Sequence, residues 1–311
     1  SLKKGKTWYS PNRGFAELRE EIAAYYKRRF GIEYDAKKQT LVTVGGSEAI
    51  DLVFRTLLDP GDEVIIPEPS FVCYEPLTVM ADGVPVIINK KNEDNFRLKA
   101  SDLRAAITPK TKLLVLPFPN NPTGAIMERE DLEEIAEVIK EHNIFILSDE
   151  IYCELTYGNK NHVSIAEIDG MYERTIVVNG FSKSYAMTGW RIGFLAAPIE
   201  LAKACSKLQG QYTSGPCSVS QMAATAAFAG PQQCVEDMRQ AFERRKNLIV
   251  KLAKEVPGFE VNDPHGAFYL FPKCSYYFGK TDGKHVINNS MDFALYLLEV
   301  GHVATVGGDA F

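Results

Sequence analysis

Short apolar runs alternate with amphipathic stretches along most of the chain. From Thr40 onward, seven runs are apolar almost throughout: LVTV, EVIIP, PVIIN, KLLVLP, IFILSD, TIVVNG and RIGFLAA. Such runs are typical of strands that are buried on both faces. Residues 48–58, 101–107 and 128–141, which lie between them, have helical spacing. The alternation predicts an α/β fold with a mainly parallel sheet, helices on both faces and ligands at the carboxyl ends of the strands.

Helical patterns also flank this region. Residues 15–30 have apolar positions at helical spacing and stop at Gly31, a residue that commonly ends helices. A helical stretch begins at Ile199, and a longer one covers residues 232–255. The latter resembles a helix that connects two domains.

The last part of the chain has a different pattern. Residues 257–273 predict two short strands around a turn, 291–300 a helix and 302–306 a strand. We therefore expect three parts, listed here by residue range: an N-terminal arm and helix over 1–35, a large domain over 36–231, and a connecting helix with a smaller α+β domain over 232–311.

The composition narrows the classes of function. The 311 residues are 45% hydrophobic and 24% charged, with a net charge of -5 and no dense stripe of Lys or Arg, which disfavours a nucleic-acid partner. No apolar run approaches the ~18 residues of a membrane helix. The six cysteines are far apart and form no Cys-x-x-Cys pair, which argues against a zinc site or a disulfide framework. We expect a cytoplasmic protein.

The segment TIVVNGFSKSYAMTGWRIG, residues 175–193, holds the first candidate chemistry. Lys183 follows a predicted strand, and Arg191 opens the next one. A lysine held near low-dielectric surroundings favours its neutral, nucleophilic form and can form an imine. Arg191 would add a permanent cation for a phosphate. Taken alone, a lysine is more often a solvated surface charge.

Asp149 closes the run IFILSD, so its carboxylate is expected where such a sheet binds ligands. A buried carboxylate there can hold a protonated ring nitrogen through a charge-assisted hydrogen bond. For a lone Asp, a helix cap or a surface charge is the more common role. Tyr152 follows about one turn later and could reach the same ligand.

Three further segments carry weaker signals. In PNNPTG, Asn121 has an amide that could bind a ligand oxygen, although such a run is usually a turn. In VGGSEAID, the backbone N–H groups of Gly46 and Ser47 lie at a predicted helix N-terminus that suits phosphate. In EPSFVCY, Phe71 could stack on an aromatic ligand, although a plain core aromatic is more common.

The order of the segments GGSEA, PSFVCY, NNPTG, SDEIY and FSKSYAMTGWRIG resembles that of class I/II aminotransferases, in the subgroup of bacterial aspartate aminotransferases. The resemblance runs from about Trp8 to Phe311. It implies a fold-type I enzyme that depends on pyridoxal 5′-phosphate (PLP). The implied reaction moves the amino group of an L-amino acid, aspartate-like or from a broad range, to 2-oxoglutarate or a similar keto acid.

The resemblance also implies roles for residues around the cofactor ring. Lys183 binds PLP as a Schiff base and, once released, moves a proton between the substrate Cα and C4′. Asp149 pairs with the pyridine nitrogen. Tyr152 and Asn121 hydrogen-bond the ring oxygen, and Phe71 stacks over the ring.

At the other end of the cofactor, the resemblance assigns the phosphate to Gly46, Ser47, Ser182 and Arg191. Tyr9, in YSPNRG, is similar to a tyrosine that reaches the phosphate of a neighbouring subunit. This similarity implies a homodimer with shared active sites.

The resemblance places two family features outside residues 1–311. The N-terminal glycine-containing segment that touches substrate would precede Ser1. The arginine that binds the substrate α-carboxylate would follow Phe311, so the small domain is expected to be incomplete at its C-terminal end. Gly307 occupies a position where relatives often carry proline.

Other functions share this scaffold. A PLP-dependent carbon–sulfur lyase and a synthase that eliminates at the γ position are alternatives, and SDEIYCELTYG favours a transaminase. A non-catalytic PLP-binding regulator is a third alternative, but the chain carries no basic winged-helix segment. A dinucleotide-dependent dehydrogenase is disfavoured because no Gly-x-Gly-x-x-Gly follows the first predicted strand.

Overall fold

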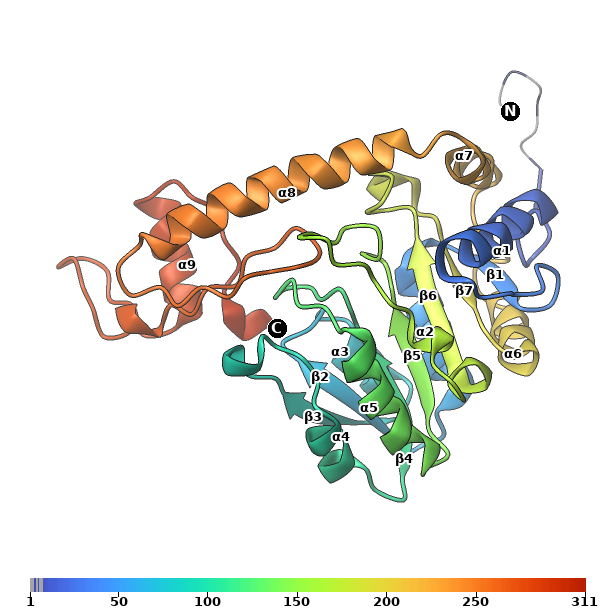
Figure 1. Ribbon diagram of the computed structural model, residues 1–311, viewed down its shortest axis with the longest axis horizontal. Helices are drawn as coiled ribbons and strands as arrows, with labels where there is room; N and C mark the ends of the chain where they lie inside the picture. Colours follow the sequence, from blue (N-terminus) through green and yellow to red (C-terminus); the bar gives the residue numbers. More distant parts are fainter. Residues whose placement is uncertain (1–2, 4, 6–7) are drawn as a thin grey trace.

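The computed structural model describes residues 3, 5 and 8–311, and its centre is a seven-stranded sheet between two layers of helices (Figure 1). The strands are β1 (Thr40–Thr43), β2 (Glu63–Glu68), β3 (Val84–Asn89), β4 (Thr111–Leu116), β5 (Phe145–Asp149), β6 (Thr175–Gly180) and β7 (Gly193–Ala196). Their order is β1-β7-β6-β5-β4-β2-β3. Strand β7 is antiparallel to both neighbours, and all other neighbours are parallel. The predicted mainly parallel sheet is confirmed.

The α-helices agree with the predicted ones within a few residues at each end. They are α1 (Ala16–Phe30), α2 (Gly45–Leu57), α3 (Tyr74–Met80), α4 (Ala100–Ala106), α5 (Arg129–Lys140), α6 (Ile199–Gln209), α7 (Ser218–Ala229), α8 (Gln233–Lys254) and α9 (Ser290–Glu299). Two of them, α3 and α7, were not predicted: α3 is short and contains a proline, and α7 is rich in Ala and Ser with little polar contrast. None of the helices in the described residues is long and apolar enough to cross a membrane.

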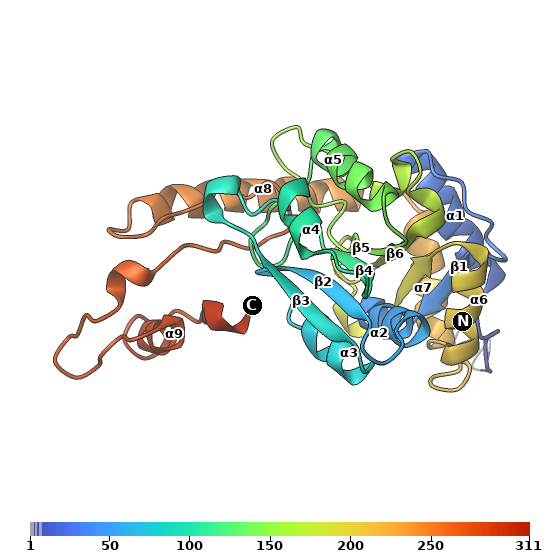
Figure 2. The ribbon, with the colours of Figure 1, turned by 90° about the horizontal axis from the view of Figure 1, so that it is seen from below.

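Alternate strand residues pack on opposite layers, as strand geometry requires. Ile176 and Val178 of β6 lie in the cluster formed with α2, α3 and α6, whereas Val177 lies in the cluster formed with α1 and α7. Farther along the sheet, α4 and α5 cover the second face through the cluster around Leu114 and Ile146. Figure 2 shows α2 and α3 on one side of the sheet and α4 and α5 on the other. The continuous apolar runs are therefore explained by burial on both faces.

The long helix α8 leads from this sheet to the C-terminal segment that contains α9 (Figure 1). The two strands predicted over residues 257–273 are wrong, because the described residues there form only isolated bridges such as Glu260 with Lys273. Pro257, Pro264 and Pro272 remove backbone donors from that stretch. The strand predicted over 302–306 is also wrong, because this exposed stretch is irregular. The proposed domain boundaries stay a prediction.

Candidate active site

A cavity of about 310 Å³ lies at the carboxyl ends of the parallel strands, where the topology predicts ligands. Nine of the ten predicted site residues line it: Gly46, Ser47, Phe71, Asn121, Asp149, Tyr152, Ser182, Lys183 and Arg191. Tyr9 does not line the cavity, and its side chain is 92% exposed in this single chain. The fold thus gathers segments that are more than a hundred residues apart in sequence.

Asp149, the last residue of β5, is the carboxylate of the cavity and is only 6% exposed. The Tyr74 hydroxyl donates to its Oδ2 at 2.8 Å, and the Ile151 backbone N–H donates to its Oδ1 at 3.2 Å. Burial raises the pKa of Asp149 to about 6, and these hydrogen bonds offset only part of the effect. A cationic hydrogen-bond donor in the cavity would stabilise the ionised carboxylate.

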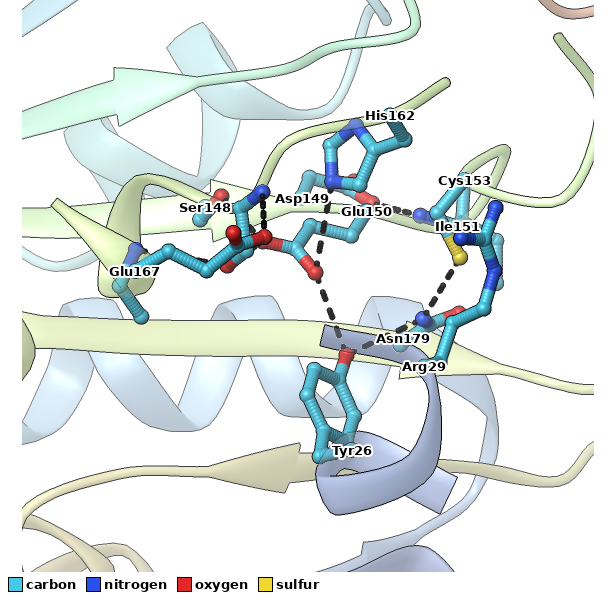
Figure 3. A network of polar contacts seen from close by, with 12 residues as sticks. Tyr26, Arg29, Ser148, Asp149, Glu150, Ile151, Cys153, His162, Glu167 and Asn179 are labelled. Atoms are coloured by element: carbon cyan, nitrogen blue, oxygen red, sulfur yellow. Dashed lines mark hydrogen bonds and ion pairs between the residues drawn. The ribbon is translucent and has the colours of Figure 1, made fainter. Parts of the chain in front are cut away.

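The next residue, Glu150, points to the opposite side of the sheet (Figure 3). It is fully buried and lies 3.5 Å from Nε2 of His162. Its carboxylate accepts hydrogen bonds from three hydroxyl groups, those of Tyr26, Ser148 and Ser164. Glu150 therefore belongs to the hydrogen-bond network of the protein core and does not line the cavity.

Lys183 lies in the turn that follows β6. Burial and the neighbouring Arg191 guanidinium lower the pKa of its amine, while Asp149 acts in the opposite direction. Its Nζ lies 5.7 Å from the ring centroid of Tyr152 and 5.6 Å from that of Phe268. The amine is therefore neutral, and nucleophilic, over a wider pH range than that of a solvated lysine.

The other end of the cavity combines a helix N-terminus with a guanidinium group. Helix α2 begins at Gly45, so the N–H groups of its first turn face the cavity beside Arg191. Gly45 has a φ of +76°, and a Cβ atom there would lie 2.6 Å from Nη2 of Arg191. A Cβ on Gly193 would lie 2.6 Å from the backbone N of Gly46. Only glycine permits this close approach, which produces a site for an anion.

The prediction that Arg191 opens the next strand is wrong. Arg191 ends the 3₁₀ helix Thr188–Trp190 in a left-handed conformation with φ of 49°, and β7 begins at Gly193. Because β7 is antiparallel to its neighbours, its first residue lies at the same edge as the last residues of β5 and β6. This reversal brings Arg191 to the cavity.

Two further polar groups line the cavity. The side-chain oxygen of Asn121 is buried and has no hydrogen-bond partner in the part of the chain that the structure describes. The hydroxyl of Tyr152 lies 2.6 Å from that of Tyr269. A buried polar atom without a partner is rare in proteins, and a ligand that donates a hydrogen bond to this oxygen would satisfy it.

Sequence reasoning missed Tyr74 and Tyr269, which also line the cavity. Tyr74 stands three residues after Phe71, so a search for a donor to Asp149 within the same segment could have found it. Tyr269 belongs to a stretch that was predicted as a strand, and no local pattern links it to Tyr152, 117 residues away.

The family model for aminotransferase class I and II matches residues 2–311. The chain belongs to this family. It is 42% identical to an aspartate aminotransferase of Geobacillus stearothermophilus and to an aromatic-amino-acid aminotransferase of Thermococcus litoralis, with all of this chain and 78% of each relative covered. The solved aspartate aminotransferase of Rhizobium meliloti superposes with a TM-score of 0.95 at 38% identity, covering 99% of this chain and 78% of that one.

The protein is therefore a PLP-dependent aminotransferase with the fold-type I architecture that the segment order predicts. The relatives' names favour transamination over the lyase, synthase and regulator alternatives. The cavity also fits the cofactor. The carboxylate of Asp149 suits a protonated pyridine nitrogen, the anion site beside Arg191 suits a phosphate, and the buried amide of Asn121, whose oxygen has no partner in the described part of the chain, also lines the cavity.

Proposed function

We propose that this aminotransferase moves the amino group of an L-amino acid, aspartate-like or from a broad range, to 2-oxoglutarate or a similar keto acid. The single observation that supports the proposal best is the cavity in which Asp149, Lys183 and Arg191 lie together with a helix N-terminus. The relatives named for aspartate and for aromatic amino acids support the range of substrates.

PLP, when bound, supplies an electron-withdrawing ring that accepts the electrons left behind when a proton leaves the substrate Cα. Lys183 holds the cofactor through its amine. Once freed from the cofactor, the Lys183 amine would take the proton from the substrate Cα and return it to C4′. The lowered pKa of Lys183 suits both roles, because each needs the neutral amine.

The remaining residues orient the ring and tune it. Asp149 accepts a hydrogen bond from the protonated ring nitrogen and keeps that nitrogen charged. Tyr152 and Asn121 bind the ring oxygen, and Phe71 packs against the face of the ring. Since these side chains come from three separate segments that the fold brings together, the ring would be held before substrate arrives.

The phosphate would be bound at the other end of the cavity by backbone and side-chain donors. The residues are Gly46, Ser47, Ser182 and Arg191. Arg191 contributes a permanent charge, and the first turn of α2 contributes N–H groups that have no partner within the helix. Together they would fix the end of the cofactor that takes no part in the reaction.

The test is borohydride reduction of the cofactor-loaded enzyme, followed by peptide mapping. We expect the label on the peptide that contains Lys183 and its loss in Lys183→Arg. Lys90 is the matched control, because burial also lowers the pKa of this amine, to about 7, and it does not line the cavity. A label on Lys90 or on any other lysine would overturn the proposal.

We further propose a homodimer in which Tyr9 reaches the phosphate of the partner subunit, in agreement with its exposed side chain in the single chain. Mixing Lys183→Ala with Tyr9→Phe chains would then restore one complete site in each hybrid dimer, measured as recovered turnover. A monomeric native mass with cofactor bound would contradict shared sites. A cytoplasmic location is also part of the proposal, because the well-separated cysteines are typical of a reducing compartment.

A further inference from the structure

Tyr152 has one hydroxyl proton, and two groups can receive it. In the proposed function Tyr152 donates to the ring oxygen of the cofactor. In the structure its hydroxyl oxygen lies 2.6 Å from that of Tyr269, and either atom can be the donor. If Tyr152 donates to Tyr269, its proton is not available to a ligand. The direction of this one hydrogen bond therefore decides what Tyr152 offers to the cavity.

Tyr269 follows a segment that backbone hydrogen bonds fasten to the loop that carries Tyr152. The Ala267 N–H donates to the carbonyl of Leu155 at 2.9 Å, and the Tyr157 N–H donates to the carbonyl of His265 at 2.9 Å. The two tyrosine rings meet edge to face, with centroids 5.8 Å apart. The Tyr269 hydroxyl is thus held beside Tyr152 by backbone contacts that do not depend on a ligand.

Within the described residues, Tyr152 is the hydrogen-bond partner that the structure gives to the Tyr269 hydroxyl. With an acceptor oxygen in the cavity, both hydroxyls are satisfied in one arrangement: Tyr269 donates to Tyr152, and Tyr152 donates to the ligand. Such a chain also strengthens the second donor, because each hydrogen bond polarises the next.

We propose that Tyr269 is a positioning residue, which donates its hydroxyl proton to Tyr152 and thereby directs the only hydroxyl proton of Tyr152 to the ring oxygen of the cofactor. The proposal rests on the function proposed for Tyr152. It assigns a role to the C-terminal segment, since Tyr269, which lies beyond α8, fixes the direction of the hydrogen bond made by Tyr152 in the turn after β5.

The test is a spectroscopic pH titration of the cofactor bound to Lys183 in the holoenzyme without substrate. A hydroxyl that donates to the ring oxygen stabilises the form without the imine proton, so Tyr152→Phe raises the titration midpoint. Tyr269→Phe is expected to raise it by less, with roughly a five-fold change in the acid constant, the equivalent of one ordinary hydrogen bond. The double variant should match Tyr152→Phe alone, because Tyr269 acts only through Tyr152.

Tyr276→Phe is the matched control, since it makes the same chemical change in the same C-terminal segment at an exposed residue that does not line the cavity. Its midpoint should equal that of the wild type. If Tyr152→Phe moves the midpoint and Tyr269→Phe does not, or if the two shifts add in the double variant, the inference about Tyr269 is overturned. If neither variant moves it, the role proposed for Tyr152 itself is wrong.

Discussion

Asp149 and Glu150 are adjacent carboxylates at the end of β5, and the fold gives them opposite surroundings. Asp149 faces the cavity, accepts hydrogen bonds from Tyr74 and the Ile151 N–H, and has its pKa raised by burial to about 6. Glu150 faces the core on the other side of the sheet, where three hydroxyl groups donate to it (Figure 3). Strand alternation accounts for the two directions.

The two carboxylates differ in where their hydrogen-bond donors come from. The protein itself supplies the donors around Glu150, which makes that carboxylate part of the structure. Around Asp149 the hydrogen bonds offset only part of the cost of burial, so a cationic donor from a ligand has most to add there. A carboxylate that the fold leaves partly uncompensated beside a cavity is therefore a better indicator of a binding site than burial alone.

The largest effect on turnover is expected from Asp149→Asn, which removes the charge that would face the ring nitrogen. Loss of one partner of a buried charged pair costs about 2–5 kcal/mol, or roughly a 30- to 4000-fold fall in turnover. Single-turnover rates with L-aspartate and saturating cofactor measure it. Glu150→Gln is the matched change on the neighbouring residue and should leave turnover close to that of the wild type. A fall of less than tenfold in Asp149→Asn would contradict the proposed role.

Glu150→Ala tests the other side of the comparison. The change leaves the hydroxyl groups of Tyr26, Ser148 and Ser164 without their acceptor. At about 1–3 kcal/mol for each buried donor left unpaired, the free energy of unfolding should fall by about 3 kcal/mol or more. Urea unfolding of the apoenzyme measures it, with Glu150→Gln, which keeps an acceptor, losing less. Equal stability of Glu150→Ala and the wild type would show that the network contributes nothing.

The smallest effect concerns the titration of Asp149 in the apoenzyme. Its pKa of about 6 in the folded state lies above the ordinary 3.8, so the folded protein retains a proton that the unfolded chain releases. The contribution of this group to stability therefore falls as the pH rises from about 4 to about 6, by at most about 3 kcal/mol. Asp149→Asn should gain stability relative to the wild type over this range in urea unfolding. A constant difference between the two proteins would refute the raised pKa.

Much of the site could be predicted from local sequence, because its residues follow buried strands. Asp149 ends one apolar run and Lys183 lies in the turn after another, the apolar character of these runs marks them as strands, and the carboxyl ends of parallel strands meet at one edge. Gly46 and Ser47 were found for a similar reason, since a strand that turns into a helix through glycines exposes backbone N–H groups there.

Other features depend on contacts between distant segments. The sequence pattern predicted strands over 257–273, but a strand forms only where another strand accepts its hydrogen bonds, and the prolines in this stretch leave only isolated bridges. Tyr269 could not be assigned for the same reason. Its place in the site depends on its contact with the hydroxyl of Tyr152, in the turn after β5, and no periodicity in the sequence indicates that contact.

Local patterns in this aminotransferase therefore specify the buried sheet, its helices and the order of the segments that carry the chemistry, because hydrophobic periodicity and turn residues act over a few residues. The tertiary structure decides which of two adjacent carboxylates faces the cavity, how an antiparallel strand brings Arg191 to the anion site, and which tyrosine touches Tyr152. These features require the paths of segments that are far apart in the chain, and only packing of the whole core brings those segments together.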